Sequence, residues 1–427
     1  VAPSAGGSPA SYTVTALDSS GNVLSPGKTC QVTGATGSCV ITGLTNGTAY
    51  KFSSTAANGA GSSSASAAST SVTPTAPPPS ITSITSSTAN GSYNAGDVIS
   101  IQVTFNQSVT VTGTPRLTLE TGSTDQVLDY ASGTGTNNLT FTYVIQTGDT
   151  SSDLTYVATN SLALNGGTIK NSSNLDAVLT LPSPAATGSL GANKAIVVDT
   201  TLPTVTSFSS TTSDGSYKAG AAINITATLS EAVTTAASIT VTLDNGQTVV
   251  LTHSAETDTL TGSYTIGAGQ SSSDLGVTSI ALTSAPADLA GNIMTSTTMP
   301  AGNISGTRAI VVDTTLPTVT SFSSTTTDGA YKVGSTINIT ATLSEAVSAA
   351  ASITVTLDSG KTVVLTHSAV NNTLIGTYTV AAGDTSADLT VSSYALTSAP
   401  ADAAGNIMSD LTVPSGSNNI AGSKAIA

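Results

Sequence analysis

With 427 residues, the chain is too long for one domain, because a single hydrophobic core stops growing at about 250–300 residues; three or four domains are expected. Only 8% of its residues are charged and 4% are aromatic, Trp is absent, and the formal net charge is −14. The 10 Lys and Arg residues are scattered singly, which argues against nucleic acid and anionic lipid as partners.

The N-terminal segment, residues 1–76, contains two stretches with strand character. Ser11 to Ala16 alternates like a mid-sheet strand, and LTNGTAYKF, from Leu44, places Tyr50 just before a second strand. These stretches resemble the C-terminal two-thirds of a bacterial fibronectin type III domain, with Tyr50 as its corner tyrosine. The resemblance implies that the leading strands are missing: either the chain starts within the domain, or another chain fills the gap.

Cys30 and Cys39 flank the turn-rich sequence TGATG and are the only cysteines. We predict a disulfide across a β-hairpin, a loop closure that stabilises by about 2–3 kcal/mol. Such a bridge implies an oxidising compartment, and hence an extracellular protein. Two free thiols in a reducing cytosol are the alternative.

A long internal repeat follows the stiff proline linker 77–79. VVDTTLPTVTSFSSTT occurs at Val197 and again at Val311, and a more distant copy carries NGSYNAGDVISIQVTF from Asn90. We name these copies the first repeat (80–198), the second repeat (199–312) and the third repeat (313–427). The third repeat stops at AGSKAIA, so we expect it to lack its last strand and the chain to be part of a longer polypeptide.

Apolar residues alternate with Thr and Asn within each repeat. In the second repeat, Ile223, Ile225, Ala227 and Leu229 would face a core while the residues between them face water. Disordered Ser/Thr tracts lack this regularity. About seven such short strands in each repeat, separated by Gly, Asp, Asn and Ser, predict an all-β fold of tandem immunoglobulin-like β-sandwiches arranged as an elongated string.

Residues 80–427 resemble the immunoglobulin-like, cadherin-like repeats of large bacterial surface adhesins and fibre proteins. The motifs that carry the resemblance are VDTTLP, DGSYKAG, LSEAV and DLAGN. The resemblance implies an extracellular spacer or fibre, often stiffened by calcium between its domains.

Acidic residues recur in register in the later repeats. In an immunoglobulin-type sandwich, the opening linker, the end of the second strand and the loop before the last strand meet at one pole. Several oxygen ligands at one pole are what Ca²⁺ requires, so we expect a structural calcium site there. The alternative is that these residues only cap turns or are solvated. The candidate ligands are Asp199, Glu231, Asp288 and Asn292 in the second repeat, and Asp313, Glu345, Asp402 and Asn406 in the third.

The first repeat departs from this set. Gln107 stands where the glutamate would be, NSSNLD from Asn171 replaces DLAGN, and the opening linker is PPPS. We therefore expect no calcium site there, so proline and packing would have to stiffen that junction.

Catalytic motifs are missing from the sequence. His253 and His367 occupy equivalent LTHS positions and are the only histidines, without the context of a catalytic triad. There is no HExxH, no CxxC pair, no phosphate-binding glycine loop and no aromatic platform. No apolar run reaches the roughly 18–20 residues of a membrane helix either. We predict a chain that is not an enzyme and has no direct membrane span.

The leading functional hypothesis is a stalk or fibre segment of a bacterial cell-surface adhesin or filament. Its partners would be further domains of the same longer chain and other copies in a fibre. One alternative is a self-assembling surface-layer or filament subunit. Another is a glycan- or protein-binding adhesin module that uses long loops between Thr112 and Gly135, although that stretch offers only Tyr130 as an aromatic.

Overall fold

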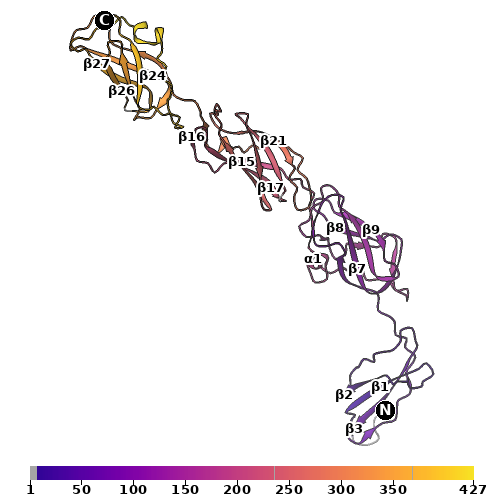
Figure 1. The fold of residues 1–427 in the computed structure, drawn as a ribbon. Coiled ribbons are helices and arrows are strands. Elements are labelled where there is room, and N and C mark those ends of the chain that lie inside the picture. Colours follow the sequence, from indigo (N-terminus) through magenta and orange to yellow (C-terminus); the bar gives the residue numbers. More distant parts are fainter. Residues whose placement is uncertain (1–6, 235, 368) are drawn as a thin grey trace. The chain divides into compact units, whose positions relative to one another are not determined.

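The computed structural model describes residues 7–234, 236–367 and 369–427, so the first six residues of the N-terminal segment lie outside the described residues. Almost all regular structure is β-strand, and the ribbon shows tandem β-sandwich domains (Figure 1). The helical elements of the described ranges are α1 (Leu190–Asn193), η1 (Ile304–Gly306), η2 (Gly416–Asn418) and η3 (Ile420–Gly422). None of these has the length and apolar character that crossing a membrane requires. The chain divides into two compact units, residues 1–198 and 199–427.

The N-terminal segment forms one antiparallel sheet in the order β2-β1-β3-β4. Its strands are β1 (Ser11–Leu17), β2 (Thr29–Thr33), β3 (Lys51–Asn58) and β4 (Gly61–Ser62). Val14 lies opposite Cys30 on β2 and opposite Ser54 on β3. Tyr50 is buried directly before β3, and its hydroxyl accepts the backbone N–H of Thr45 at 2.9 Å, as a corner tyrosine does.

The first repeat contains the most strands. They are β5 (Ile81–Ser86), β6 (Gly91–Tyr93), β7 (Val98–Thr112), β8 (Arg116–Glu120), β9 (Gln126–Ser132), β10 (Thr136–Val144), β11 (Thr155–Tyr156), β12 (Leu162–Ala163), β13 (Thr168–Lys170) and β14 (Ile196–Val198). The main sheet path is β11-β8-β9-β10-β7-β13. Phe105, Phe141 and Tyr143 are buried in its core, and β14 pairs in parallel with β6.

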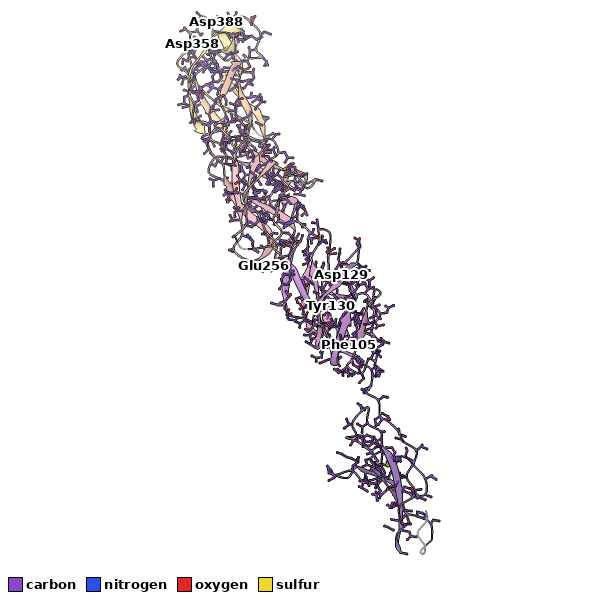
Figure 2. The ribbon with its side chains drawn as sticks, turned by 90° about the vertical axis from the view of Figure 1, so that its right-hand side faces the viewer. Phe105, Asp129, Tyr130, Glu256, Asp358 and Asp388 are labelled. Atoms are coloured by element: carbon purple, nitrogen blue, oxygen red, sulfur yellow. A yellow bond between two sulfur atoms is a disulfide. The ribbon has the colours of Figure 1, made fainter. Side chains whose placement is uncertain are left out.

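The stretch from Thr112 to Gly135 is not the set of long loops that we expected. It contains β8 and β9, which pair along their length and place Arg116 opposite Asp129. Arg116 Nε lies 2.7 Å from Asp129 Oδ1, in an exposed ion pair; Asp129 is labelled in Figure 2. Because this surface is a paired sheet, it is less adaptable than the loops that a binding module would use.

The second and third repeats have the same topology. The strands of the second are β15 (Val205–Ser209), β16 (Gly215–Tyr217), β17 (Ala222–Val233), β18 (Ser238–Leu243), β19 (Thr248–Thr252), β20 (Thr257–Thr265), β21 (Val277–Ser284) and β22 (Ile310–Val312). Those of the third are β23 (Val319–Ser323), β24 (Thr336–Val347), β25 (Ser352–Leu357), β26 (Thr362–Thr366), β27 (Asn371–Thr379) and β28 (Val391–Ser398). The sheet orders are β15-β17-β20-β19-β18-β21 and β23-β24-β27-β26-β25-β28.

Each of these six-stranded sheets folds over on itself to make a sandwich. β19 and β20 are joined by the single pair Thr252–Thr261, so the strands on either side of that seam form two faces. The alternation in β17 is as predicted: Ile223, Ile225 and Ala227 are buried, and the residues between them are not. Their burial beside the other face builds the core of the second repeat.

A short parallel strand closes the second repeat. β22 pairs in parallel with β16, and its last residue, Val312, is only 2% exposed. In the third repeat the same role falls to Ile426, which forms a single parallel bridge with Gly329.

Candidate metal centres

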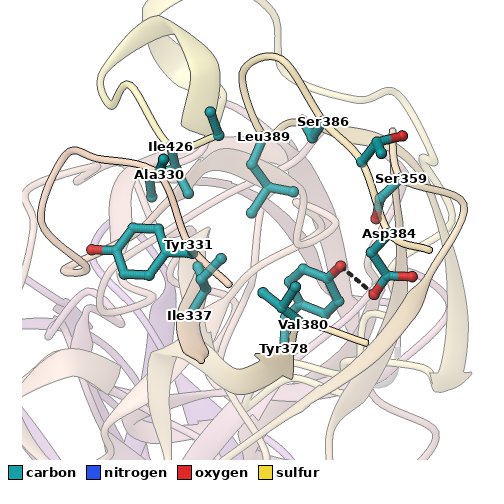
Figure 3. A pocket seen from close by; sticks show the side chains of 12 residues that line it. Ala330, Tyr331, Ile337, Ser359, Tyr378, Val380, Asp384, Ser386, Leu389 and Ile426 are labelled. Carbon is teal, nitrogen blue, oxygen red and sulfur yellow. Dashed lines mark hydrogen bonds between the residues drawn. The ribbon is translucent and has the colours of Figure 1, made fainter. Parts of the chain in front are cut away.

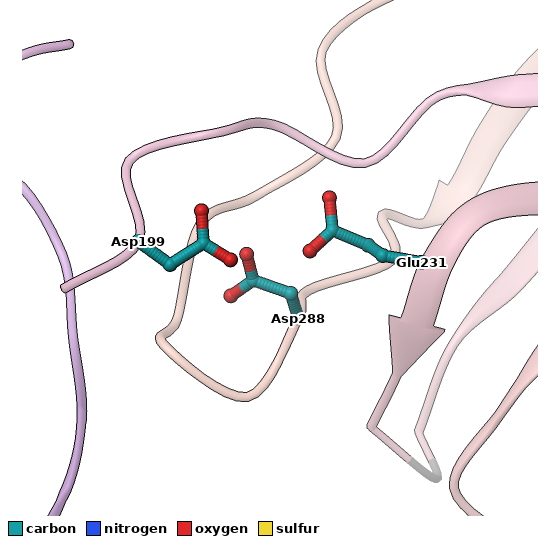
Figure 4. Close-up of side chains that lie close together, drawn as sticks. All are labelled: Asp199, Glu231 and Asp288. Atoms are coloured by element: carbon teal, nitrogen blue, oxygen red, sulfur yellow. The ribbon is translucent and has the colours of Figure 1, made fainter. Parts of the chain in front are cut away.

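Three carboxylates from three separate elements meet at one end of the second repeat. Asp199 comes from the linker, Glu231 from β17, and Asp288 from the loop after β21 (Figure 4). One carboxylate oxygen from each lies within 4.8 Å of the others. Oxygen atoms at such separations can all contact one cation, because Ca²⁺ binds oxygen ligands at about 2.3–2.6 Å.

An irregularity in β17 positions Glu231. Thr228 pairs with Thr259 and Val233 pairs with Thr257, so four residues of β17 lie where β20 has one. Such a bulge bends the strand and redirects a side chain, which lets Glu231 leave the regular in–out alternation. The strand resumes at Val233, which bridges to Asp288 and so brings the two carboxylates to the same place.

A tight loop positions Asp288. The backbone N–H of Asn292 donates to Asp288 Oδ1 at 2.8 Å, and Asn292 Nδ2 donates to Asp288 Oδ2 at 2.7 Å. Gly291 has φ of 90°, a conformation that favours glycine, and its N–H donates to the Asp288 carbonyl. Since each carboxylate oxygen can accept two hydrogen bonds, Asp288 retains acceptor capacity for a cation.

Asn292 connects the other residues of the site through its side-chain amide nitrogen. Besides Asp288, its Nδ2 donates to the backbone carbonyl of Asp199 at 2.9 Å. The same amide nitrogen therefore ties the loop to the linker. Asp199 is further fixed by the N–H of Thr201, which donates to Asp199 Oδ1 at 2.9 Å. The sequence pattern identified Asn292 as part of the site but could not assign it this positioning role.

The third repeat reproduces the arrangement. Asp313, Glu345 and Asp402 form a second cluster within 4.8 Å. Asn406 donates from its backbone N–H to Asp402 Oδ1 at 2.9 Å, and from Nδ2 to Asp402 Oδ2 at 2.8 Å and to the Asp313 carbonyl at 2.9 Å. Gly405 has a positive φ of 82°, as Gly291 does. Six of the eight candidate ligands therefore lie in the two carboxylate clusters, and the two asparagines hydrogen-bond to members of those clusters.

The carboxylates in each cluster repel one another when they are charged. Burial raises the pKa of Glu231 to about 7, and the carboxylates of Asp199 and Asp288 reinforce the shift. Burial likewise raises the pKa of Glu345, with further contributions from Asp402 and Asp313. Two carboxylates about 4 Å apart near a protein surface repel by roughly 4 kcal/mol, so each cluster has a strong physical reason to bind a proton or a cation.

The donor set defines which cation fits. Each cluster offers only carboxylates, without His or Cys, and oxygen-only sites suit hard cations such as Ca²⁺ and Mg²⁺ rather than Zn²⁺. Backbone carbonyls and water would complete the shell. Both clusters can hold a metal ion of this class.

The first repeat has uncharged amide side chains where the later repeats have their carboxylate clusters. Gln107 Nε2 donates to the Pro77 carbonyl at 2.9 Å, and Asn171 Nδ2 contacts Gln107 Oε1 at 3.5 Å. Asn171 Oδ1 accepts the N–H of Leu175 at 3.0 Å, as Asp288 accepts that of Asn292. Amides therefore hold the linker there by direct hydrogen bonds, with no clustered charge.

The remaining predicted residues lie elsewhere. Cys30 and Cys39 are joined by a disulfide in the N-terminal segment. His253 Nε2 lies 2.7 Å from the Thr234 carbonyl, and His367 Nε2 contacts the Ser348 carbonyl, so both histidines bind backbone next to their strands.

No family model matches the chain, and no curated protein matches it. Among solved structures, the chain is similar to the FN1–FN3 domains of chicken CNTN1, at 11% sequence identity, covering 66% of this chain and 85% of that chain, with a TM-score of 0.21. A TM-score of 0.21 is too low to indicate a shared fold. The class follows from the fold itself: tandem β-sandwiches, two of them with a cluster of three carboxylates, here called the acidic corner, that can hold a metal ion.

Proposed function

We propose that the chain is a non-catalytic, extracellular structural segment: part of a stalk or fibre of a bacterial surface adhesin or filament. In this proposal, Ca²⁺ bound at the acidic corners fixes each later repeat to the linker that opens it. The division into 1–76, 80–198, 199–312 and 313–427 stays a prediction, with further domains of a longer chain and neighbouring copies as the partners.

The observation that carries this proposal is the recurrence of the acidic corner. The same three carboxylates, with the same supporting asparagine, occur in both later repeats. Catalytic groups in one chain seldom need such duplication, whereas a mechanical element gains from every repeat that is stiffened. The proposal therefore assigns the corners a structural role.

A cation at the corner would act on the linker directly. Asp199 belongs to the linker, whereas Glu231 and Asp288 belong to the sandwich, so an ion bound by all three opposes movement of the linker away from the repeat. Without the ion, mutual repulsion of the carboxylates pushes the linker outwards. The ion thus converts a repulsive contact into an attractive one.

The surface chemistry supports self-association into fibres. Few charges oppose close approach, and exposed apolar residues stand among threonines on equivalent strands: Val250 on β19 is 52% exposed and Val364 on β26 is 51% exposed. In this proposal, these recurring valines lie in the lateral contacts between copies. The disulfide supports an oxidising, extracellular setting.

Thermal unfolding of the full chain tests the proposal. We expect Ca²⁺ at about 100 times its dissociation constant to stabilise each later repeat by about 2.7 kcal/mol, a shift of several degrees relative to EDTA. The double variant Glu231→Gln, Glu345→Gln should lose this response. Glu256→Gln, a matched change at an exposed residue outside both clusters, should retain it. An identical melt with Ca²⁺, Mg²⁺ and EDTA would remove cations from the proposal.

A further inference from the structure

Lys218 forms a hydrogen bond between the second and third repeats. It lies in the second repeat, directly after β16, and its Nζ donates to the backbone carbonyl of Gly405 in the third repeat at 3.0 Å. Both repeats belong to the same compact unit, residues 199–427. Gly405 lies in the loop that carries Asp402, one of the three clustered carboxylates. The second repeat therefore contacts the third at the loop of its acidic corner.

One peptide group connects this contact with the acidic corner. The carbonyl of Gly405 accepts from Lys218. The N–H of the same peptide group, which belongs to Asn406, donates to Asp402 Oδ1 at 2.9 Å. An ammonium at the oxygen end of a peptide group polarises it, which makes its N–H a stronger donor. Lys218 thus strengthens the hydrogen bond that holds the Asp402 carboxylate in place.

The contact closes a ring of hydrogen bonds around the linker. Tyr217, the residue before Lys218, accepts the N–H of Asp313 at 3.0 Å. The carbonyl of Asp313 accepts from Asn406 Nδ2 at 2.9 Å, and Asn406 directly follows Gly405. The carbonyl that Lys218 contacts is therefore already held in position. An isolated lysine on a protein surface has no such fixed partner and contributes little.

The linker is held by the second repeat at another point as well. Thr314 Oγ1 accepts the N–H of Gly269 at 3.0 Å and donates to the carbonyl of Gln270 at 3.0 Å. Thr314 follows Asp313, so two consecutive linker residues hydrogen-bond to the second repeat. The Lys218 contact adds a direct connection between the two repeats to this attachment of the linker.

The loop that holds Thr314 is anchored within its own repeat. Gln270 Oε1 accepts the hydroxyl of Tyr264, which is buried. Asp384 has the same position in the third repeat and accepts the Tyr378 hydroxyl at 2.7 Å (Figure 3). Because the anchor recurs, we interpret this loop as a fixed part of each sandwich. The linker therefore rests on a fixed surface of the second repeat.

The charge of Lys218 suits the acidic corner of the third repeat. Its ammonium offsets part of the negative charge of three clustered carboxylates when no cation is bound. It donates to a neutral backbone carbonyl, so this contact leaves the carboxylate oxygens available to a cation.

We infer that Lys218 joins the second repeat to the third through the loop 402–406 and positions Asp402 for a cation. Lys218 acts through the Gly405 peptide group, so it is a positioning residue. The cation part of this inference rests on the proposed function, whereas the contact between the repeats needs no ion. Because coupling between two sites is reciprocal, an ion that fixes the loop also restrains the second repeat relative to the third.

The first experiment uses the full chain in EDTA. Residual dipolar couplings of the backbone amides report whether the second and third repeats share one alignment, and hydrogen exchange follows the Asn406 amide. Lys218→Met removes the ammonium and keeps a long side chain. We expect one common alignment in the wild type and separate alignments in Lys218→Met. Exchange at Asn406 should accelerate about threefold in the variant, the size of effect typical of one charged contact at an exposed side chain.

Lys218→Arg and Lys332→Met are the matched controls. Lys218→Arg keeps a charged donor and should retain the common alignment and the slow exchange. Lys332 has the equivalent position in the third repeat, so Lys332→Met changes the net charge equally and should leave both measurements unchanged. Separate alignments in the wild type would overturn the inference. So would an alignment and an exchange rate in Lys218→Met that equal those of the wild type.

A second experiment tests how Lys218 positions Asp402. Ca²⁺ is titrated into the full chain, and the amide signals of Asn292 and Asn406 follow the acidic corners of the second and third repeats separately. Lys218→Met should raise the midpoint at Asn406 about threefold and leave the midpoint at Asn292 unchanged. Equal shifts at both amides would assign the effect to net charge alone and contradict the positioning role.

A lower midpoint at Asn406 in Lys218→Met would show that Lys218 mainly repels the ion, and it would also overturn the positioning role. If Ca²⁺ shifts neither amide of the wild type, calcium drops out of the proposed function. The experiment in EDTA then still decides whether Lys218 joins the two repeats.

Discussion

Val312 and Asp313 are consecutive in the chain but serve different repeats. The Val312 side chain is buried in the core of the second repeat, whereas the Asp313 carboxylate belongs to the acidic cluster of the third. A single peptide bond therefore separates an apolar anchor from a candidate cation ligand. Because both ends of that bond are fixed, the linker has little length over which to bend.

Replacing Val312 with Ala tests the anchor. Removing two buried methyl groups should destabilise the second repeat by about 1–3 kcal/mol, from lost burial and the cavity that remains. Val250→Ala, at an exposed position on β19, is the matched control and should change stability by about 0.5 kcal/mol or less. Denaturant unfolding measures both. Equal effects of the two changes would contradict the role of Val312 as an anchor.

The raised pKa of Glu231, about 7 against an ordinary 4.5, predicts an unusual pH dependence of stability without cations. Between these values the folded second repeat holds a proton that the unfolded chain has lost, so raising the pH favours unfolding. Stability should fall from about pH 4.5 through pH 7 in EDTA, and added Ca²⁺ should stabilise more at pH 8 than at pH 5. Melting curves over this range, with Glu231→Gln as the variant expected to flatten them, measure the effect. A stability that rises with pH in EDTA would refute it.

Replacing Gln107 with Glu tests the neutral corner of the first repeat. The change removes the Nε2–H donor to the Pro77 carbonyl and places a carboxylate against that oxygen, so a loss of about 1–3 kcal/mol is expected. Ca²⁺ should not restore the loss, because Asn171 supplies no second charge. Gln102→Glu, on the outer face of β7, is the control. Full rescue by Ca²⁺ would show that one carboxylate suffices for binding, against the three-carboxylate interpretation.

The alternation of β17 and the recurring acidic residues were readable from the sequence because they depend on period and register alone. Ile223, Ile225 and Ala227 are buried as their spacing predicts. The convergence of Asp199, Glu231 and Asp288 follows from strand order in a sandwich. Patterns repeated at a fixed offset are the strongest signals available to such an argument.

Features that depend on three-dimensional packing were not readable. The bulge that positions Glu231 could not be predicted from the sequence LSEAV, because it depends on how β17 pairs with β20. The strands β8 and β9 lie where we expected loops, although Leu117 and Leu119 of β8 alternate with polar residues as in a strand. The sequence pattern does not distinguish Val312 from other valines in strands. Its burial and its hydrogen bonds with Ser272 identify it as an anchor.

Reducing the Cys30–Cys39 disulfide should weaken the N-terminal segment selectively. The bridge closes a loop with a sequence separation of 9, and restricting a loop of that length in the unfolded chain stabilises by about 2–3 kcal/mol. Hydrogen exchange of β1 and β3 should accelerate with reductant, while the repeats stay unchanged. The variant Cys30→Ser, Cys39→Ser should match the reduced chain. Equal protection of β1 and β3 in oxidised and reduced chains would show that the sheet does not depend on the bridge.

Asn406 offers the sharpest test of how the acidic corner is held together. Its Nδ2 joins Asp402 Oδ2 to the Asp313 carbonyl, so Asn406→Ala leaves two partly buried acceptors without this donor. The expected cost without cation is about 1–3 kcal/mol. The cation response should also weaken, because the linker and the loop are no longer held at matching positions, whereas Asn372→Ala, at an exposed residue of β27, should change neither quantity.

A merely structural role for Asn406 would lower the melting temperature equally with and without Ca²⁺. A positioning role lowers the Ca²⁺ affinity as well, so a titration of the melting temperature against Ca²⁺ concentration separates the two. A shift of the titration midpoint to higher Ca²⁺ is therefore the expected result, since the ligands must be brought together at the expense of binding free energy. An unchanged midpoint, with a uniformly lower melting temperature, would leave Asn406 as a loop-stabilising residue only.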